Sequence, residues 1–356
     1  MNEEDSPLEP EKKTLGKVYF ILGSYLLLVL VMIFSTFVGP VRIPFLYVAQ
    51  IYGTQIPFLG QFIPHNFDFT QYEIVVYLRE PEVIGGVVVG ASLGIGGAAI
   101  QSVFRNPITE PYIIGLSSGA SLGAVTAIVF GLTLYGFYTV QAFAFLSSMA
   151  VVTLVYLFSF RGGMAHPTYL LLTGVAFSLL ISSIVALLIF TNITLQGEAF
   201  FWLLGSLQNI TWPELDLVVV IVLISSILIG NYYRELNAMQ MGEAHARAVG
   251  VNVESVKRNI FFLVALSVSA AVSISGLIGF VGLVIPHISR SIYGGSNKYV
   301  IPSSAALGAI FLLLADDIAR SIVTGIVIPI GIVTGIAGVP FFLYFLNKLG
   351  GARNES

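Results

Sequence analysis

Apolar runs long enough to cross a lipid bilayer follow one another along nearly the whole of this 356-residue chain. A transmembrane helix needs about 20 consecutive, mostly apolar residues, and such runs occur roughly ten times here. Only 10% of the residues are charged, against about 25% in an ordinary soluble domain, and the mean hydropathy is +0.91. The sequence therefore predicts an all-α polytopic membrane protein with about ten transmembrane helices, near residues 18–38, 83–104, 111–131, 139–160, 168–190, 214–231, 258–276, 278–293, 301–319 and 327–347.

The distribution of basic residues predicts the orientation of the chain. Lys and Arg concentrate in the cytoplasmic loops of membrane proteins. If the chain crosses the membrane ten times, 13 of the 16 basic residues fall on one side of it. The other three, Arg42, Arg79 and Arg320, fall on the opposite side. We therefore expect both termini in the cytoplasm, as a tail over 1–17, a transmembrane region over 18–349 and a tail over 350–356. The first 17 residues lack the apolar core of a signal peptide, so the first span is predicted to be retained.

Composition excludes several classes of function. The formal net charge of -3 leaves no basic stripe for a nucleic-acid partner. Without Cys there are no disulfides, thiolate metal sites or thiol catalysis, and the four His do not cluster along the sequence, so no metal site and no cofactor is predicted. No GxxxxGK[ST] motif is present, so the chain is not expected to be an enzyme that hydrolyses nucleotide through a P-loop of its own.

A long polar interruption, residues 232–258, lies between two apolar runs on the predicted cytoplasmic side. Within it Glu243 and Arg247 stand four apart, as do Ala244 and Ala248, which predicts a short helix with an ion pair beside a small-residue stripe. Glycine precedes and follows this helix, as is common at helix ends. The loop is either a solvated connection or a docking surface, and its candidate docking residues are Gly242, Glu243, Ala244, Ala246, Arg247, Ala248 and Gly250.

A proline-held turn joins the second and third predicted spans. Pro107 and Pro111 stand four apart in the segment 105–111, and each proline biases the residue before it away from helix. The turn is therefore stiff and narrow, and it could either close a pore or form a structural hairpin. The two spans it joins carry glycine at every fourth position, which lets helix backbones approach closely in lipid, at Gly86, Gly90, Gly94, Gly115, Gly119 and Gly123.

Several stretches of the sequence resemble those of one known family, in the family's order and spacing. The sequence resembles the membrane permease subunits of ABC importers for iron-siderophores, haem and cobalamin, over nearly the whole chain after the first span. The matching stretches are LREPE at 78–82, GASLGIGGAAIQSVFRNPITEPYIIGLSSGASLGA at 90–124, WLLGSL at 202–207, MGEAHARAVGV at 241–251, GLIGFVGLVIPHISR at 276–290, LLLADDIAR at 312–320 and IPIGIVTGIAGVPFFLYFL at 328–346.

The resemblance implies a partnership and a set of sites. It implies a cell-membrane subunit that pairs with a second copy of itself, with two cytoplasmic ATPase subunits and with an external substrate-binding protein. The family's ATPase-docking loop falls on 242–250, and its cytoplasmic gate falls on Asn106, Pro107 and Ile108. Its outward arginines, which meet acidic groups of the binding protein, match Arg79 and Arg320.

Two positions depart from the family pattern. Glu82 stands where the family commonly has a second Arg, and Val327 stands where an acidic residue often precedes Leu-Pro. The loss of a positive charge at Glu82 puts the usual docking electrostatics in question. The pathway is expected to be lined by apolar and small side chains, so selectivity is expected to lie with the binding protein, and the substrate is not readable.

An ion-coupled secondary transporter is the competing class, since spans 2–5 and 7–10 could form an internal repeat. Ion coupling needs ionisable groups near the bilayer centre. The candidates Asp216, Asp316 and Asp317 lie near the ends of predicted spans, which favours charges at the membrane interface.

Overall fold

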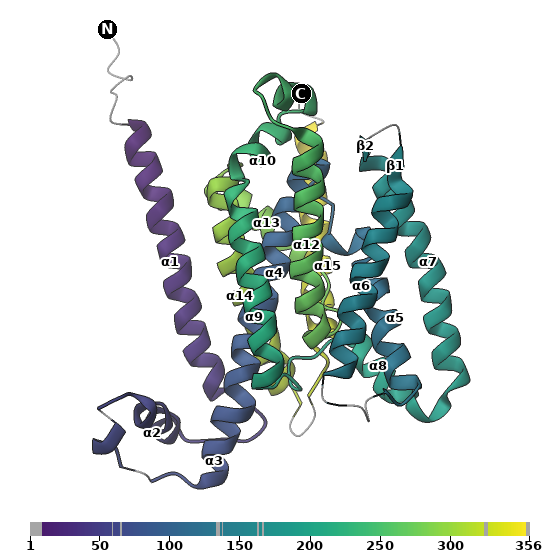
Figure 1. Ribbon diagram of the computed structural model, residues 1–356. Helices are drawn as coiled ribbons and strands as arrows, with labels where there is room; N and C mark the ends of the chain where they lie inside the picture. The colour runs from purple at the N-terminus through teal and green to yellow at the C-terminus, as the bar shows by residue number, and fades with distance from the viewer. Residues whose placement is uncertain are drawn as a thin grey trace.

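The computed structural model describes residues 9–353, except 59, 65, 133–135, 137, 162–163, 166 and 324–326. The described chain is helical apart from one two-stranded ladder, in which Phe160 pairs with Ala165 (Figure 1). The elements are α1 Glu9–Phe37, α2 Phe45–Gln55, η1 Gly60–Phe62, α3 Phe69–Glu73, η2 Ile74–Arg79, α4 Glu80–Phe104, η3 Pro111–Ile114, α5 Leu116–Val129, α6 Thr139–Ser159, β1 Phe160–Arg161, β2 Met164–Ala165, α7 Pro167–Thr191, η5 Ile193–Leu195, α8 Gln196–Leu204, α9 Trp212–Asn231, α10 Tyr233–Gln240, α11 Glu243–Ala248, α12 Val253–Ser275, α13 Val281–Tyr293, α14 Asn297–Ser321 and α15 Ile330–Arg353.

Each of the ten predicted spans contains a helix of the structure. Seven stretches of the described chain are long and apolar enough to cross a membrane: Gly16–Phe37, Phe69–Phe104, Thr139–Ser159, Pro167–Thr191, Trp212–Asn231, Val253–Ser275 and Asn297–Ser321. The other three predicted spans hold α5, α13 and the apolar part of α15, Ile330–Tyr344, which are shorter. At 1.5 Å per residue α5, α13 and this apolar part of α15 extend only about 20 Å each, so the length of the apolar segment alone does not make them spans. Ten crossings therefore stay a prediction.

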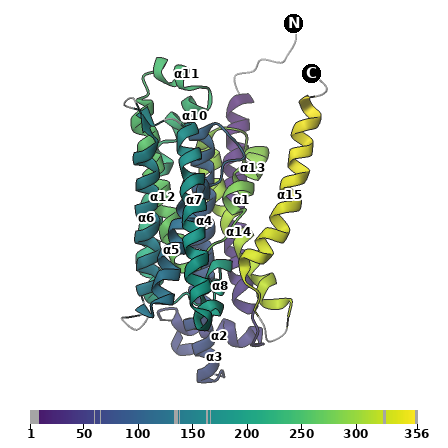
Figure 2. The same ribbon diagram turned by 90° about the vertical axis from the view of Figure 1, so that its right-hand side faces the viewer.

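The bundle has two distinct ends. The α11 end carries α10 and α11, together with the start of α1 and the end of α15 (Figures 1 and 2). The α8 end carries α2, α3 and α8 (Figure 1). The start of α1 and the end of α15 thus lie at the same end as the predicted docking loop. Which end faces the cytoplasm stays a prediction.

Helix α4 is the centre of the bundle and packs against α14, α12, α13 and α9. Its glycines allow this packing, because a Cβ on Gly90 would lie 2.4 Å from the carbonyl oxygen of Gly308, and one on Gly94 would lie 2.2 Å from that of Ser304. The second stripe acts likewise between α5 and α6, where a Cβ on Gly123 would lie 2.0 Å from the carbonyl oxygen of Phe143. Both stripes are therefore helix contacts, as predicted for small residues in lipid.

Candidate functional site

The predicted docking helix exists as α11, and it protrudes beyond the bundle at the α11 end (Figure 2). Gly242 precedes it with φ +124° and Gly250 follows it with φ +86°, both in the region that favours glycine. Ala244 and Ala248 are exposed, so the small-residue face is open at the surface. Ala246, also predicted to dock, is instead fully buried in the core, because it lies on the opposite face of the helix. Ala246 therefore seats α11 on the bundle.

A charged network fastens α11 to the start of α12. The predicted pair between Glu243 and Arg247 is present, with 3.7 Å between the carboxylate and guanidinium atoms. Glu243 also accepts from the nearly buried Lys257 at 2.7 Å, and Glu254 lies 3.5 Å from both Arg247 and Lys257. The sequence pattern did not predict these contacts of Glu254 and Lys257, which lie in the first five residues of the next helix. The network makes α11 a rigid projection.

The predicted gate segment forms a tight exposed turn at the end of α4. Arg105 ends the helix in the left-handed region with φ +51°. The side-chain oxygen of Asn106 accepts a hydrogen bond from the backbone N–H of Ile108 at 3.0 Å, which closes the turn around Pro107. Ile108 is 46% exposed, an unusual setting for a large apolar side chain at the tip of a turn. We call residues 105–108 the gate turn.

A hydrogen-bonded relay joins the docking loop to the gate turn. Gln240, the last residue of α10, donates to the hydroxyl of Ser102 at 2.9 Å, three residues before the gate turn. Ser102 donates in turn to Asn297 at 3.0 Å, and the backbone N–H of Asn297 donates to the side chain of Asn237 at 2.7 Å. Ser102 and Asn297 are fully buried. The ends of α4, α10 and α14 therefore meet in one polar cluster directly behind the gate turn.

The chain after the gate turn is anchored deeper in the bundle. Glu110 accepts a hydrogen bond from the backbone N–H of Phe280 at 3.0 Å, at the start of α13. Tyr112 donates to the carbonyl oxygen of Ile278 at 3.0 Å. These two contacts bind the segment that follows the gate turn to the break between α12 and α13. The break itself was expected near residues 276–282, where no charge separates two apolar runs.

Three glycine-marked interruptions meet at the α8 end. Gly205 and Gly276 have φ +73° and +66°, and a Cβ on Gly276 would lie 2.3 Å from the carbonyl oxygen of Trp202. Gly331 approaches the carbonyl oxygen of Leu204 in the same way, at 2.3 Å from an added Cβ. Backbone hydrogen bonds join the same three segments: the N–H of Ser206 donates to the carbonyl oxygen of Ser275 at 2.8 Å, and the N–H of Ile330 donates to that of Gly205 at 3.1 Å. The motifs at 202–207, 276–290 and 328–346 thus form one junction.

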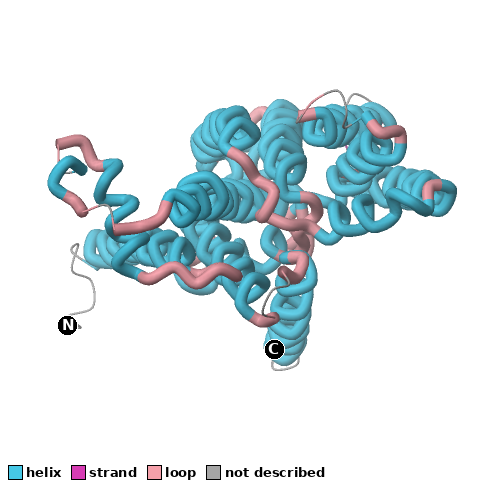
Figure 3. Tube along the Cα trace, turned by 90° about the horizontal axis from the view of Figure 1, so that it is seen from below, coloured by secondary structure: helices cyan, strands magenta, loops and turns pink. Residues whose placement is uncertain are grey.

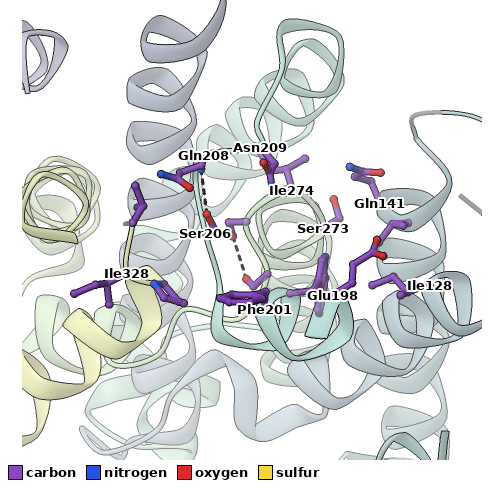
Figure 4. A pocket seen from close by; sticks show the side chains of 16 residues that line it. Ile128, Gln141, Glu198, Phe201, Ser206, Gln208, Asn209, Ser273, Ile274 and Ile328 are labelled. Atoms are coloured by element: carbon purple, nitrogen blue, oxygen red, sulfur yellow. Dashed lines mark hydrogen bonds between the residues drawn. The ribbon is translucent and has the colours of Figure 1, made fainter. Parts of the chain in front are cut away.

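A cavity of about 490 Å³ opens beside this junction (Figure 4). Gln141 and Glu198 lie on one side of it, and Ser206 and Gln208 lie on the other (Figure 4). The rest of the lining mixes apolar and polar side chains, Ile128, Val140, Phe201, Trp202, Asn209, Ser273, Ile274, Ser275, Val327, Ile328 and Pro329. The lining of this cavity is therefore more polar than the apolar and small side chains predicted for the pathway. Nothing in the sequence pattern of Gln141 or Glu198 could have placed them together, because they come from different helices.

The two arginines predicted to stand outward are buried instead. Arg320 is 3% exposed and pairs with Glu82, Asp316 and Asp317 at 3.1, 2.8 and 2.9 Å. Arg79 is also 3% exposed and donates to the carbonyl oxygen of Thr36 at 3.0 Å, so it holds the end of α1. The expectation of exposed rim charges was wrong, because a buried charge needs close partners and these arginines have them inside the chain.

Comparisons with known proteins agree with this geometry. The FecCD transport family matches residues 27–348. The chain is 37% identical over 279 residues to a cobalamin import system permease protein of Halobacterium salinarum, which covers 78% of this chain and 74% of that protein. It is 34% identical over 344 residues to a molybdate import system permease protein of Haemophilus influenzae, which covers 94% of this chain and 97% of that protein. A solved inward-facing conformation of a metal-chelate type ABC transporter has a TM-score of 0.79 and 32% identity, covering 93% of this chain and 99% of that chain. The chain therefore belongs to the FecCD transport family, as a membrane permease of an ABC importer.

Proposed function

We propose that this permease forms a homodimer with ten spans per copy and moves a metal complex inward. In this assembly an external binding protein delivers the substrate and two cytoplasmic ATPase subunits supply the energy. The names of the relatives support a metal-containing substrate, since one is a cobalamin import permease and another a molybdate import permease. Iron-siderophore, haem and cobalamin-type substrates remain the candidates.

The observation that carries the proposal is the relay between Gln240 and Ser102. An ATPase that moves α11 is expected to move α10 with it, because only Met241 and Gly242 lie between the two helices. Gln240 then passes the movement to Ser102, and Ser102 lies three residues before the gate turn. Glu110 and Tyr112 hold the far side of the segment on the α12–α13 break. A displacement at α11 is thus expected to tilt the gate turn about a fixed anchor.

The cavity beside the three glycine interruptions is proposed as the outer part of the pathway. It lies at the α8 end, opposite α11, where a binding protein would release its substrate. The amides of Gln141, Gln208 and Asn209 and the hydroxyl of Ser206 can exchange hydrogen bonds with a hydrated complex as it passes. We further propose that the binding protein docks on the outer rim beneath which Arg79 and Arg320 are buried.

The test is transport by the purified complex. The permease, its ATPase and its binding protein are reconstituted in proteoliposomes, and uptake of ferric chelates, haem, corrinoids and molybdate is measured. ATP inside and binding protein outside should be required for uptake of one of these, and an ion gradient without ATP should drive none. Uptake driven by an ion gradient alone would instead support the secondary transporter, the class that family membership already disfavours.

Docking is measured separately, as binding-protein affinity at low and high salt. Reversal of Arg42 to Glu, at an exposed position between α1 and α2, should weaken capture more at low salt than at high salt, and unchanged affinity in folded permease would remove this rim as the docking site.

A further inference from the structure

Residues 43–67 contain no Asp, Glu, Lys or Arg, although they lie between α1 and α4 in a segment expected outside the membrane. Helix α2 occupies the first part of this stretch. Its inner face is buried on a small core of Ile43, Val48, Ile51 and Val75. Its outer face and the turn after it are also apolar, with Phe45 68%, Leu46 60%, Phe58 89% and Phe62 77% exposed. We call these four residues the α2 patch.

The position of the α2 patch indicates what covers it. The segment projects sideways from the bundle at the level of the α8 end, and it does not lie across the bundle (Figures 1 and 3). Phe45 packs on Phe37 at the end of α1, with ring centroids 4.7 Å apart. The outer face of α1 is itself apolar and exposed, at Phe20, Leu26, Leu30 and Phe34 for example. The α2 patch therefore continues the lipid-facing surface of α1 around the end of that helix.

Phe58 adds an independent observation. It has φ +68°, a left-handed backbone that bulky residues rarely adopt. A strained backbone persists only where its surroundings or its function require it. Here the strain holds an aromatic ring outward from the protein, where exposure to water would add a second cost. Aromatic rings of this kind are stable at the boundary between acyl chains and headgroups.

We propose that α2 and the following turn form an interfacial anchor, with the α2 patch inserted into the outer boundary of the bilayer. A helix that is apolar on both faces needs an apolar cover on each, and here protein covers one and lipid the other. The uncharged stretch ends at Asp68, where α3 begins, so the chain leaves the lipid there. The anchor would fix the end of α1 and the depth of the outer rim in the membrane.

The absence of Cys makes the test direct. Single Cys variants Phe58→Cys and Phe62→Cys, labelled with an environment-sensitive fluorophore, are placed in the complete complex in nanodiscs. Leu26→Cys on α1 is the lipid-exposed control and Thr70→Cys on α3 the water-exposed control, since both side chains are exposed. Lipids brominated near the headgroup should quench the labels at 58 and 62 several-fold more than the label at 70. Deeply brominated lipids should quench the label at 26 most.

Two results would overturn the proposal. Labels at 58 and 62 with water-like emission and no quenching would show that the patch faces solvent. Blue-shifted emission without quenching, found in the complex or only after the binding protein is added, would assign the patch to a protein partner, either a second copy or the binding protein. Near-native binding of the ATPase by each labelled variant confirms that it is folded, so the readout is independent of transport.

Discussion

Single residues carry the electrostatic balance of the α8 end, and Glu82 shows this most directly. The family pattern commonly has Arg here, yet Glu82 lies 3.1 Å from Arg320 and is 6% exposed. The departure therefore has a role inside the chain, since Glu82 adds a third carboxylate to the buried Arg320, where an arginine would place a like charge. Asp316 and Asp317 complete the cluster from α14. The charge of Glu82 thus has a structural role in the buried cluster.

Replacement of Glu82 by Gln should destabilise the permease by about 1–3 kcal/mol, because it removes one of the three carboxylates that contact the buried Arg320, while Asp316 and Asp317 keep their contacts. The measurement is thermal or denaturant unfolding in detergent. Glu73→Gln is the matched control, since Glu73 is exposed in α3 and should change stability little. Equal stability of the two variants would mean that the buried cluster does not depend on Glu82.

The relay between Gln240 and Ser102 makes a second prediction at this scale. Gln240→Met keeps the length of the side chain and removes its donors, which should cost about 1–3 kcal/mol where the partner is left unpaired. Transport per ATP hydrolysed should fall, while ATPase binding stays close to wild type. A double-mutant cycle with Ser102→Ala separates the shared contact from independent effects. Fully additive losses would show that the two residues do not act as a pair.

At the scale of elements, periodicity and spacing predicted more than contacts did. Residues 242–250 were recognised as a short glycine-flanked helix because Glu243 and Arg247 obey the four-residue spacing of a helix face. The glycine stripe of α4 predicted close packing for the same reason, although not that Gly90 would meet Gly308 of α14. Lys257, Glu198 and Gln141 carried no local signal. Their partners come from other helices, which no local pattern reveals.

Helix α11 makes the element-scale prediction. Ala248→Trp places a large ring on an exposed face that is proposed to fit into an ATPase, so it should weaken ATPase binding tenfold or more, about 1.4 kcal/mol per factor of ten. Binding is measured between the purified permease and its ATPase. Thr70→Trp is the control, because Thr70 is also exposed but lies on α3, away from α11. Wild-type affinity for Ala248→Trp would exclude this face as the docking surface.

The whole molecule connects its two ends through one break in the bundle. On one side of the break at 276–280, Gly276 and Gly205 form the junction beside the cavity. On the other side Glu110 and Tyr112 anchor the chain that leads from the gate turn. A change in the gate is therefore expected to alter the cavity junction as well. The sequence predicts ten spans, but it does not reveal this connection, because the connection depends on where three interruptions meet in space.

The proposed homodimer makes the final prediction, which concerns Ile108. Ile108 is 46% exposed at the tip of the gate turn, where a second gate turn across a dimer axis would cover it. In this Cys-free chain, Ile108→Cys should cross-link one subunit to the other, and the yield should change with the nucleotide bound to the ATPase. The yield is read from the dimer band on a non-reducing gel.

Ala244→Cys is the control. Ala244 is exposed, as Ile108 is, and lies at the same end of the bundle, but it is on the proposed ATPase face. It should give little subunit cross-link in any nucleotide state when the ATPase is bound. Disulfide formation requires the two Cβ atoms within about 4.5 Å, so a strong signal at 108 demands close approach of the two turns. Absence of the cross-link in every nucleotide state, in a complex that still transports, would place the gate turns away from the axis and contradict their role as a gate.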